Sequence, residues 1–190
     1  MSISEISTGT TDEMIAESIR LLNEDQKERG LELINQVVVN QPNHVTAFVV
    51  KAAILLATEE NFEVIQTCEK IKSLTDTHTY LDDTYEIPMG LVYMLEAMAF
   101  SNMDKNDQAM DLIQTAIKIN KIAPFVFIRG MLHMDNEDYI KAEKDMEFAI
   151  NNPYPFKILG NDEIKQELDS MALVVMQVAK GMNVFKAFAA

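Results

Sequence analysis

The sequence predicts an all-α protein built from antiparallel helix hairpins, and two kinds of pattern support this prediction. Apolar residues recur at spacings of three and four along almost the whole chain, as in Ile15, Ile19 and Leu22, which is the period of a helix with one buried face. Clusters of Asn, Asp, Glu and Pro interrupt the pattern about once per helix, as at 40–43 and 135–138. Such residues cap helices and form turns. The alternating pattern of a half-buried strand is nearly absent.

Composition narrows the class of protein. The chain has 190 residues, of which 48% are hydrophobic, so it has enough apolar material for one packed domain. Its net charge is -14, so nucleic acid is not expected as its main partner. The single cysteine, Cys68, cannot form an internal disulfide. The first residues lack the basic start and apolar run of a signal peptide, and no apolar stretch reaches membrane-spanning length. We therefore expect a single cytoplasmic domain over 1–190, with no membrane insertion.

Four segments share one frame of small and apolar residues, which predicts four helix hairpins at about 11–44, 45–76, 90–122 and 123–155. Small residues in the first helix let two helices approach closely. The second helices align at Gly30, Val64, Ala109 and Ala142, which are separated by 34, 45 and 33 residues. Two of these spacings match a repeat of about 34 residues, and the longer one predicts an insertion at about 74–88. The small residues of the first helices are Ser18, Ala52, Ala97 and Gly130.

The fourth segment resembles a tetratricopeptide (TPR) repeat. It has Gly130 in the first helix, Ala142 and Ala149 in the second, and a closing Pro153. The other three segments fit the same frame more loosely. The resemblance implies a TPR-like right-handed superhelix whose concave side is lined by the first helices and binds other proteins. Size, acidity and the absence of Trp are also similar to the TPR chaperones of bacterial type III secretion, which hold hydrophobic subunits before export.

A C-terminal capping helix is predicted at 161–180, with Gly181 as its stop and an apolar tail at 182–190. A cap of this kind covers the last repeat of a helical array. Its apolar stripe is Ile164, Leu168, Met171, Val175 and Val178.

In the TPR frame, the non-packing positions of the first helices should face the partner, and here almost none is polar. The TPR carboxylate clamp uses Lys, Asn and Arg at such positions, so that ligand class is not expected. The 13 methionines suit varied apolar partners, because the thioether side chain is flexible. The predicted partner-binding residues are Ile15, Ile19, Val49, Val50, Leu56, Leu91, Met94, Leu95, Met98, Phe127, Ile128, Met131 and Met134.

The sequence thus favours a cytoplasmic chaperone or adaptor that holds a hydrophobic or amphipathic segment of a partner protein in an apolar, Met-rich concave groove. The same side chains are equally compatible with ordinary inter-helix core. Two other functions stay open: a scaffold or assembly factor whose groove is filled by its own C-terminal helix, and a ligand-dependent regulator. A homodimer is also compatible with the sequence.

No catalytic residue, cofactor or metal site is expected. His78 lies near Asp82 and Asp83 in the acidic insertion, but the spacing is not that of metal ligands. His133 and Cys68 fall at packing positions, and His44 falls at a helix cap. No phosphate-binding loop or nucleophile motif is present in the sequence. The insertion is expected to be a solvated segment, with a landing site for a basic partner as the alternative.

Overall fold

The computed structural model describes residues 9–76, 89–152 and the helix Asp162–Ala189. Within these ranges every regular element is a helix, so the predicted all-α fold is confirmed. The chain divides into two compact units, Met1–Pro88 and Met89–Ala190. The predicted insertion from residue 77 onward and the predicted closing Pro153 lie outside the described residues.

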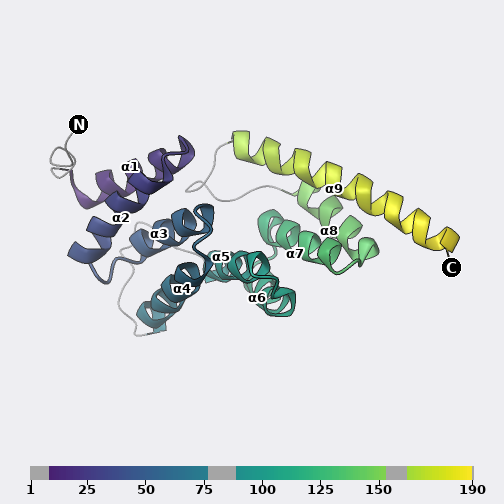
Figure 1. Cartoon of the computed structure of the whole chain (residues 1–190), viewed down its shortest axis with the longest axis horizontal. Helices are drawn as coiled ribbons and strands as arrows, with labels where there is room; N and C mark the ends of the chain where they lie inside the picture. The colour runs from purple at the N-terminus through teal and green to yellow at the C-terminus, as the bar shows by residue number, and fades with distance from the viewer. Residues whose placement is uncertain (1–8, 77–88, 153–161, 190) are drawn as a thin grey trace. The chain divides into compact units, whose positions relative to one another are not determined.

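The first unit contains two helix hairpins, which are drawn from purple to blue in Figure 1. In each hairpin the two helices pack against each other, and α2 also packs against α3. The core between them includes Ile15, Ile34, Val50 and Ile54. The helices are α1 (Thr11–Asn23), α2 (Lys27–Asn40), α3 (Val45–Ala57) and α4 (Asn61–Asp76).

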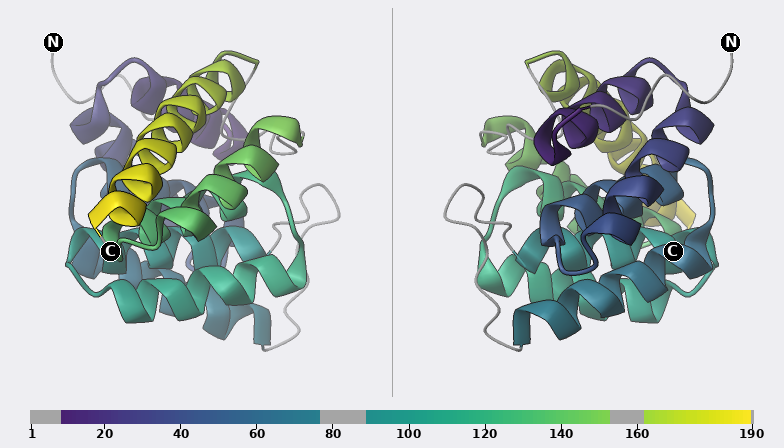
Figure 2. Two further views of the ribbon diagram at one scale, coloured as in Figure 1. Left: turned by 90° about the vertical axis from the view of Figure 1, so that its right-hand side faces the viewer. Right: turned by 90° about the vertical axis from the view of Figure 1, so that its left-hand side faces the viewer.

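The second unit contains two further hairpins and one long helix. Here α6 packs against α7, and α9 lies along α8 with a smaller contact to α7 (Figure 2). These neighbours bury Phe125, Leu132 and Met146 almost completely. The helices are α5 (Met89–Asn102), α6 (Asn106–Ile119), α7 (Ala123–Asp135), α8 (Tyr139–Asn151) and α9 (Asp162–Ala189).

The turn inside each hairpin contains one acidic residue in the left-handed backbone region. These residues are Asp25, Glu59, Asp104 and Glu137, with φ between 57° and 62°. They are separated by 34, 45 and 33 residues, which are the spacings of the second-helix frame. A side chain with a Cβ is strained in this region. Because the same unusual backbone recurs at the same intervals, the four hairpins repeat in structure as well as in sequence.

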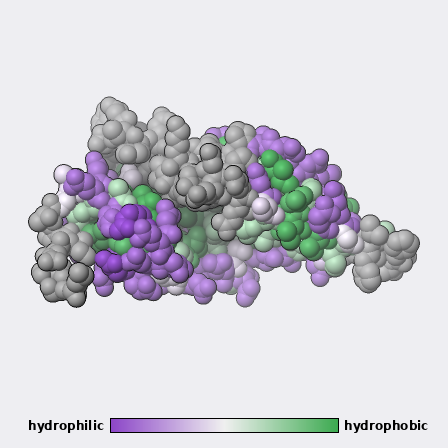
Figure 3. All heavy atoms as spheres, turned by 90° about the horizontal axis from the view of Figure 1, so that it is seen from above, coloured by the Kyte–Doolittle hydropathy of each residue, from purple (hydrophilic) through white to green (hydrophobic). Residues whose placement is uncertain are grey.

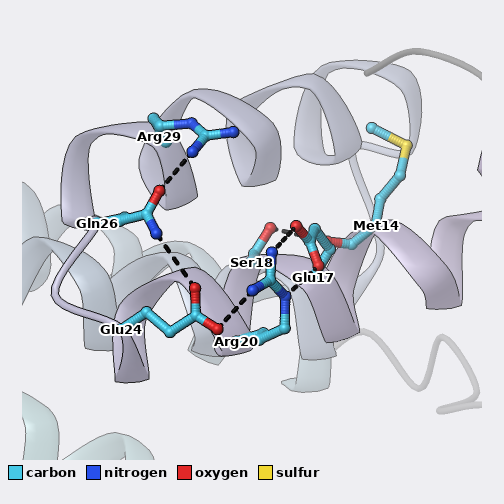
Figure 4. A network of polar contacts seen from close by, with 7 residues as sticks. All are labelled: Met14, Glu17, Ser18, Arg20, Glu24, Gln26 and Arg29. Atoms are coloured by element: carbon cyan, nitrogen blue, oxygen red, sulfur yellow. Dashed lines mark hydrogen bonds and ion pairs between the residues drawn. The ribbon is translucent and has the colours of Figure 1, made fainter. Parts of the chain in front are cut away.

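Side-chain caps begin several helices. Thr10 and Glu13 form a capping box at the start of α1, and the His44 Nδ1 accepts a hydrogen bond from the Ala47 N–H at 3.2 Å, so the predicted capping role of His44 is confirmed. At the other end of α1, Arg20 contacts both Glu17 and Glu24 (Figure 4). The Arg20 contacts are exposed, and such pairs add little stability.

Small residues allow close helix contact where the sequence predicts it. A Cβ built on Gly130 of α7 would lie 2.7 Å from the Met146 Cε and 3.1 Å from the Asp145 Cβ of α8, distances that leave almost no room for a side chain. Ala52 and Ala97 are fully buried. Gly90, which the sequence frame does not single out, is tighter still, because an added Cβ would lie 2.6 Å from the Phe125 ring.

The prediction for the C-terminal helix is wrong in two respects. Helix α9 continues through Gly181 to Ala189, and no glycine among the described residues has a positive φ, so Gly181 does not act as a helix stop. The buried face also differs from the predicted stripe: Met171 and Val178 are exposed, whereas Ala172 and Ala179 are buried. The reason is close packing, because alanine lets the backbones of α8 and α9 approach more closely than methionine or valine does. Val175 of the stripe does pack against the cluster that contains Phe127, and the side chains of Ile164 and Leu168 lie outside the described residues.

Candidate partner-binding surface

The structure divides the thirteen predicted partner-binding residues into two groups. Seven have less than 9% of their surface exposed and belong to the packed interior: Ile15, Val49, Val50, Leu91, Met94, Leu95 and Phe127. Six are half-buried: Ile19, Leu56, Met98, Ile128, Met131 and Met134. A first helix packs on the second helix of its own hairpin and on the neighbouring hairpin, so it needs apolar residues on more than one face.

In the first unit, the half-buried members lie on α1 and α3. Ile19 and its neighbour Leu22 pack against the cluster that contains Ile34 and Val50, while part of each side chain stays accessible. Leu56, near the end of α3, is also half-buried. Ile19 and Leu22 therefore contribute both to the core and to an accessible apolar surface, and Leu56 contributes to that surface.

In the second unit, α9 contacts the α7 part of the predicted surface. Ile128 and Met131 pack against a cluster that contains Phe127 of α7 and Ala172 of α9, together with Met176 of α9. The residues Met134 and Met182 pack on a second cluster, formed by Tyr139, Ala142 and Ala179. These contacts are of the kind expected for the scaffold alternative, in which the C-terminal helix covers first-helix side chains.

A buried charge cluster joins α7 to α8 beside Gly130. The Arg129 Nε and Nη2 donate hydrogen bonds of 2.7 and 2.6 Å to the two carboxylate oxygens of Asp145, whose side chain is only 9% exposed. The Asp145 hydrogen bonds raise the pKa of Arg129. The sequence does not reveal this pair, because the two residues are sixteen positions apart and a charged residue on a helix gives no sign of a buried partner.

His133 lies at the edge of the same cluster, with its Nε2 3.9 Å from the Asp145 Oδ2. Burial lowers the pKa of His133, while the charges of Asp145 and Asp138 act in the opposite direction. The imidazole is therefore easier to keep neutral in the folded protein than in the unfolded chain. This position fits the predicted packing role of His133.

The part of the chain that the structure describes offers few residues for metal binding or for reactions of cysteine. No group of three or more His, Cys, Asp or Glu side chains there is arranged to hold a metal ion. Cys68 is fully buried, in agreement with its predicted packing position. Among the described helices, none is long and apolar enough to cross a membrane.

Hydrophobic side chains also gather on the outer face of α9, at the right of Figure 3. Val174 is 62% exposed, Val178 48% and Met171 45%. Met171 and Val178 belong to the stripe predicted for the packed side of this helix. Sequence alone does not separate the two faces, because both are apolar.

No protein-family model and no curated protein matches this sequence. Solved structures do match it. TTC0263, a thermophilic TPR protein of Thermus thermophilus, is 9% identical with a TM-score of 0.68, and the match covers 87% of this chain and 82% of that one. The chain has the TPR fold. MamA from Desulfovibrio magneticus RS-1 is 15% identical, with a TM-score of 0.58 and coverage of 74% of each chain.

A third solved structure is YrrB, described as a TPR protein with an unusual peptide-binding site. It is 15% identical, with a TM-score of 0.53, and the match covers 89% of this chain and 84% of that chain. At these identities the likeness concerns the fold. The TPR resemblance read from the sequence is thereby confirmed at the level of architecture.

Proposed function

We propose that this chain is a protein-binding module that holds a hydrophobic or amphipathic segment of a partner protein against the apolar side of its first helices. The observation that carries the proposal is that each unit has half-buried apolar side chains on its own first helices: Ile19 and Leu56 in the first unit, and Met98 in the second. The peptide-binding site described for YrrB, a protein of the same fold, supports this use of the TPR scaffold.

Apolar contact supplies enough free energy for such binding. At about 25 cal/mol per Å², a segment that covers about 500 Å² of apolar surface gains about 12 kcal/mol before the costs of association and ordering. Methionine at position 98 adapts to partners of different shape, because its side chain has three rotatable bonds.

Within this proposal the chain acts as a cytoplasmic chaperone or adaptor. A bound apolar segment is removed from water and cannot associate with other copies of itself, so protection requires no chemical step. The proposal assigns direct contact to Ile19, Leu56 and Met98. The seven buried ones hold the first helices in place.

Substitutions on the first helices test this proposal. Ile19→Glu, Leu56→Glu and Met98→Glu should each remove partner proteins that the wild-type chain retains during affinity purification from its native cell, because each puts a charge on the apolar surface. The matched control is Phe62→Glu, which adds the same charge at a 60% exposed position on a second helix. Far-UV circular dichroism should show equal helicity for all variants. Retention of partners by all three first-helix variants, or their loss in Phe62→Glu, would refute the proposed surface.

A second function, a scaffold or assembly factor, is supported by the position of α9. Ala172 of α9 belongs to the cluster on which Ile128 and Met131 pack, so in this alternative the α7 part of the surface belongs to the fold. Partners would then bind elsewhere on the chain. In that case the three first-helix variants above should still retain partners.

A further inference from the structure

Helix α9 has apolar residues on two faces. One face packs on α7 and α8 through Ala172, Val175, Met176 and Ala179, of which the two alanines are buried. The other face carries Met171, Val174 and Val178, which are 45%, 62% and 48% exposed. The terminal helix of a repeat array normally has a polar outer face, because nothing follows to cover it. An apolar outer face therefore indicates that another helix packs there.

The position of α9 indicates what kind of helix this is. Helix α9 packs on α8 and, more weakly, on α7, just as α7 packs on α6 and, more weakly, on α5. It therefore stands where the first helix of a further hairpin would stand. A first helix also packs against an antiparallel second helix, as α7 does against α8. The apolar outer face of α9 is the face that such a second helix would cover.

The exposed residues have the spacing of a helix-pairing seam. Met171, Val174 and Val178 follow one another by three and four positions, as the a and d positions of a heptad do. The same spacing continues in the sequence through Gly181 to Phe185. The neighbouring exposed positions Ser170 and Gln177 are uncharged, so the seam carries no acidic group, although the chain as a whole has a net charge of -14.

Charge along the α9 sequence favours one occupant and one orientation. Residues 162–175 include four acidic residues and one lysine, whereas residues 176–189 include Lys180 and Lys186 and no acidic residue. A second α9 in antiparallel orientation therefore places each acidic half beside a basic half, and a parallel one places like charges together. Lys180 lies 3.8 Å from Glu143 of its own chain, so it stands at the edge of the α8–α9 contact. We propose that two copies of this chain form a homodimer through antiparallel pairing of their α9 helices.

The area buried between the two α9 helices determines the expected affinity of the dimer. Twenty-eight residues at about 1.5 Å each give a helix of about 42 Å. A contact strip about 10 Å wide along that length covers about 420 Å² on each copy, or about 840 Å² in total, which is below the range of standard interfaces. The dimer should therefore be reversible, with a dissociation constant in the micromolar range. It uses the outer face of α9, so it does not depend on the proposed partner-binding surface.

The oligomeric state of the full chain tests the proposal. Sedimentation equilibrium between about 1 and 200 μM should show a monomer–dimer equilibrium for the wild type. Val174→Glu and Val178→Glu should each raise the dissociation constant at least tenfold without loss of helicity, because both positions are exposed in one copy. Leu173→Glu is the matched control: Leu173 is 49% exposed on the same helix but off the seam, so the dimer should persist. A wild type that stays monomeric at about 200 μM, or a dimer that both valine variants leave intact, overturns the proposal.

Orientation is tested separately by spin labels placed on single cysteines in a Cys68→Ala background. In an antiparallel pair centred on the middle of α9, labels at Gln177 should lie within about 20 Å of each other, and labels at Ala187 about 35 Å apart at a rise of about 1.5 Å per residue. A parallel pair gives short distances at both sites, and that result overturns the antiparallel assignment. The absence of any distance between copies, with the label at Gln177 immobilised, would show that another part of the same chain covers the seam, and it overturns the dimer.

Discussion

Arg129→Met should destabilise the second unit more than Asp145→Ala, the variant that removes the ion-pair partner of Arg129. Two charge-assisted hydrogen bonds link Arg129 to Asp145, and the Asp145 side chain is 9% exposed whereas that of Arg129 is 24% exposed. Methionine keeps most of the aliphatic stem of arginine, so the variant mainly removes the charge. It leaves the carboxylate of Asp145 buried and without its cation.

The expected loss in the free energy of unfolding follows from this difference in burial between Asp145 and Arg129. Removing one partner of a fully buried ion pair costs about 3–5 kcal/mol, and some access of water here reduces the expected cost of Arg129→Met to about 2–3 kcal/mol. Asp145→Ala should cost only about 1 kcal/mol, because the partly exposed guanidinium of Arg129 is able to turn toward water.

Urea unfolding measures the free energy of unfolding of both variants. Far-UV circular dichroism is the probe, because the sequence has no tryptophan for fluorescence. The midpoint of the transition that belongs to the second unit should fall while the m-value stays constant. Equal costs for the two variants, or a cost below about 1 kcal/mol for Arg129→Met, would show that Asp145 is better solvated than its position between α7 and α8 implies.

Three further substitutions test the description of individual residues. Burial lowers the pKa of His133 from 6.5, so the folded protein binds a proton there less readily than the unfolded chain does. The free energy of unfolding should therefore fall as the pH drops through about 6.5. In His133→Gln, the urea midpoint should fall less between about pH 7.5 and 5.5 than it does in the wild type. Glu59→Gly should raise the melting temperature by relieving the positive φ of 62°, a gain of about 0.5–1 kcal/mol after the entropy cost of glycine, whereas Glu59→Ala should give no such gain. Met131→Glu should lower the stability of the second unit by about 1–2 kcal/mol, because the side chain packs on the cluster that contains Phe127 and Ala172; thermal unfolding that matches the wild type would place Met131 on a free surface instead.

The hairpins were predictable because local residues determine them. Close helix contact admits only small side chains, so Gly130 and Ala142 are visible in the sequence as a frame. The left-handed turn residues Asp25 and Glu59 would have been harder to assign, because a glycine is the usual signal of that backbone. The end of α9 was not predictable from Gly181, since a glycine inside a helix costs only about 1 kcal/mol and packing along α8 compensates for it.

The candidate surface was only partly predictable, for a different reason. The helical period groups apolar residues into faces, but a first helix has more than one apolar face. Whether Val50 or Leu56 is accessible depends on which neighbouring hairpin covers it, and that contact is not local in sequence. The buried pair of Arg129 and Asp145 was unpredictable for the same reason, because either residue alone resembles an ordinary solvated charge.

The same non-local dependence explains why α9 is apolar on both sides. A first helix inside the array is covered on one side by the preceding hairpin and on another by its own second helix, so selection for packing acts on both sides. Helix α9 packs on α8 with Ala172 and Ala179, yet Val174 on its other side is 62% exposed. An exposed valine does not help α9 to cap the repeat array, because a polar residue at this position would make the protein more soluble. It does have a role if the second helix is supplied by another copy, and an antiparallel α9 pair reproduces the orientation that every hairpin of this chain already has.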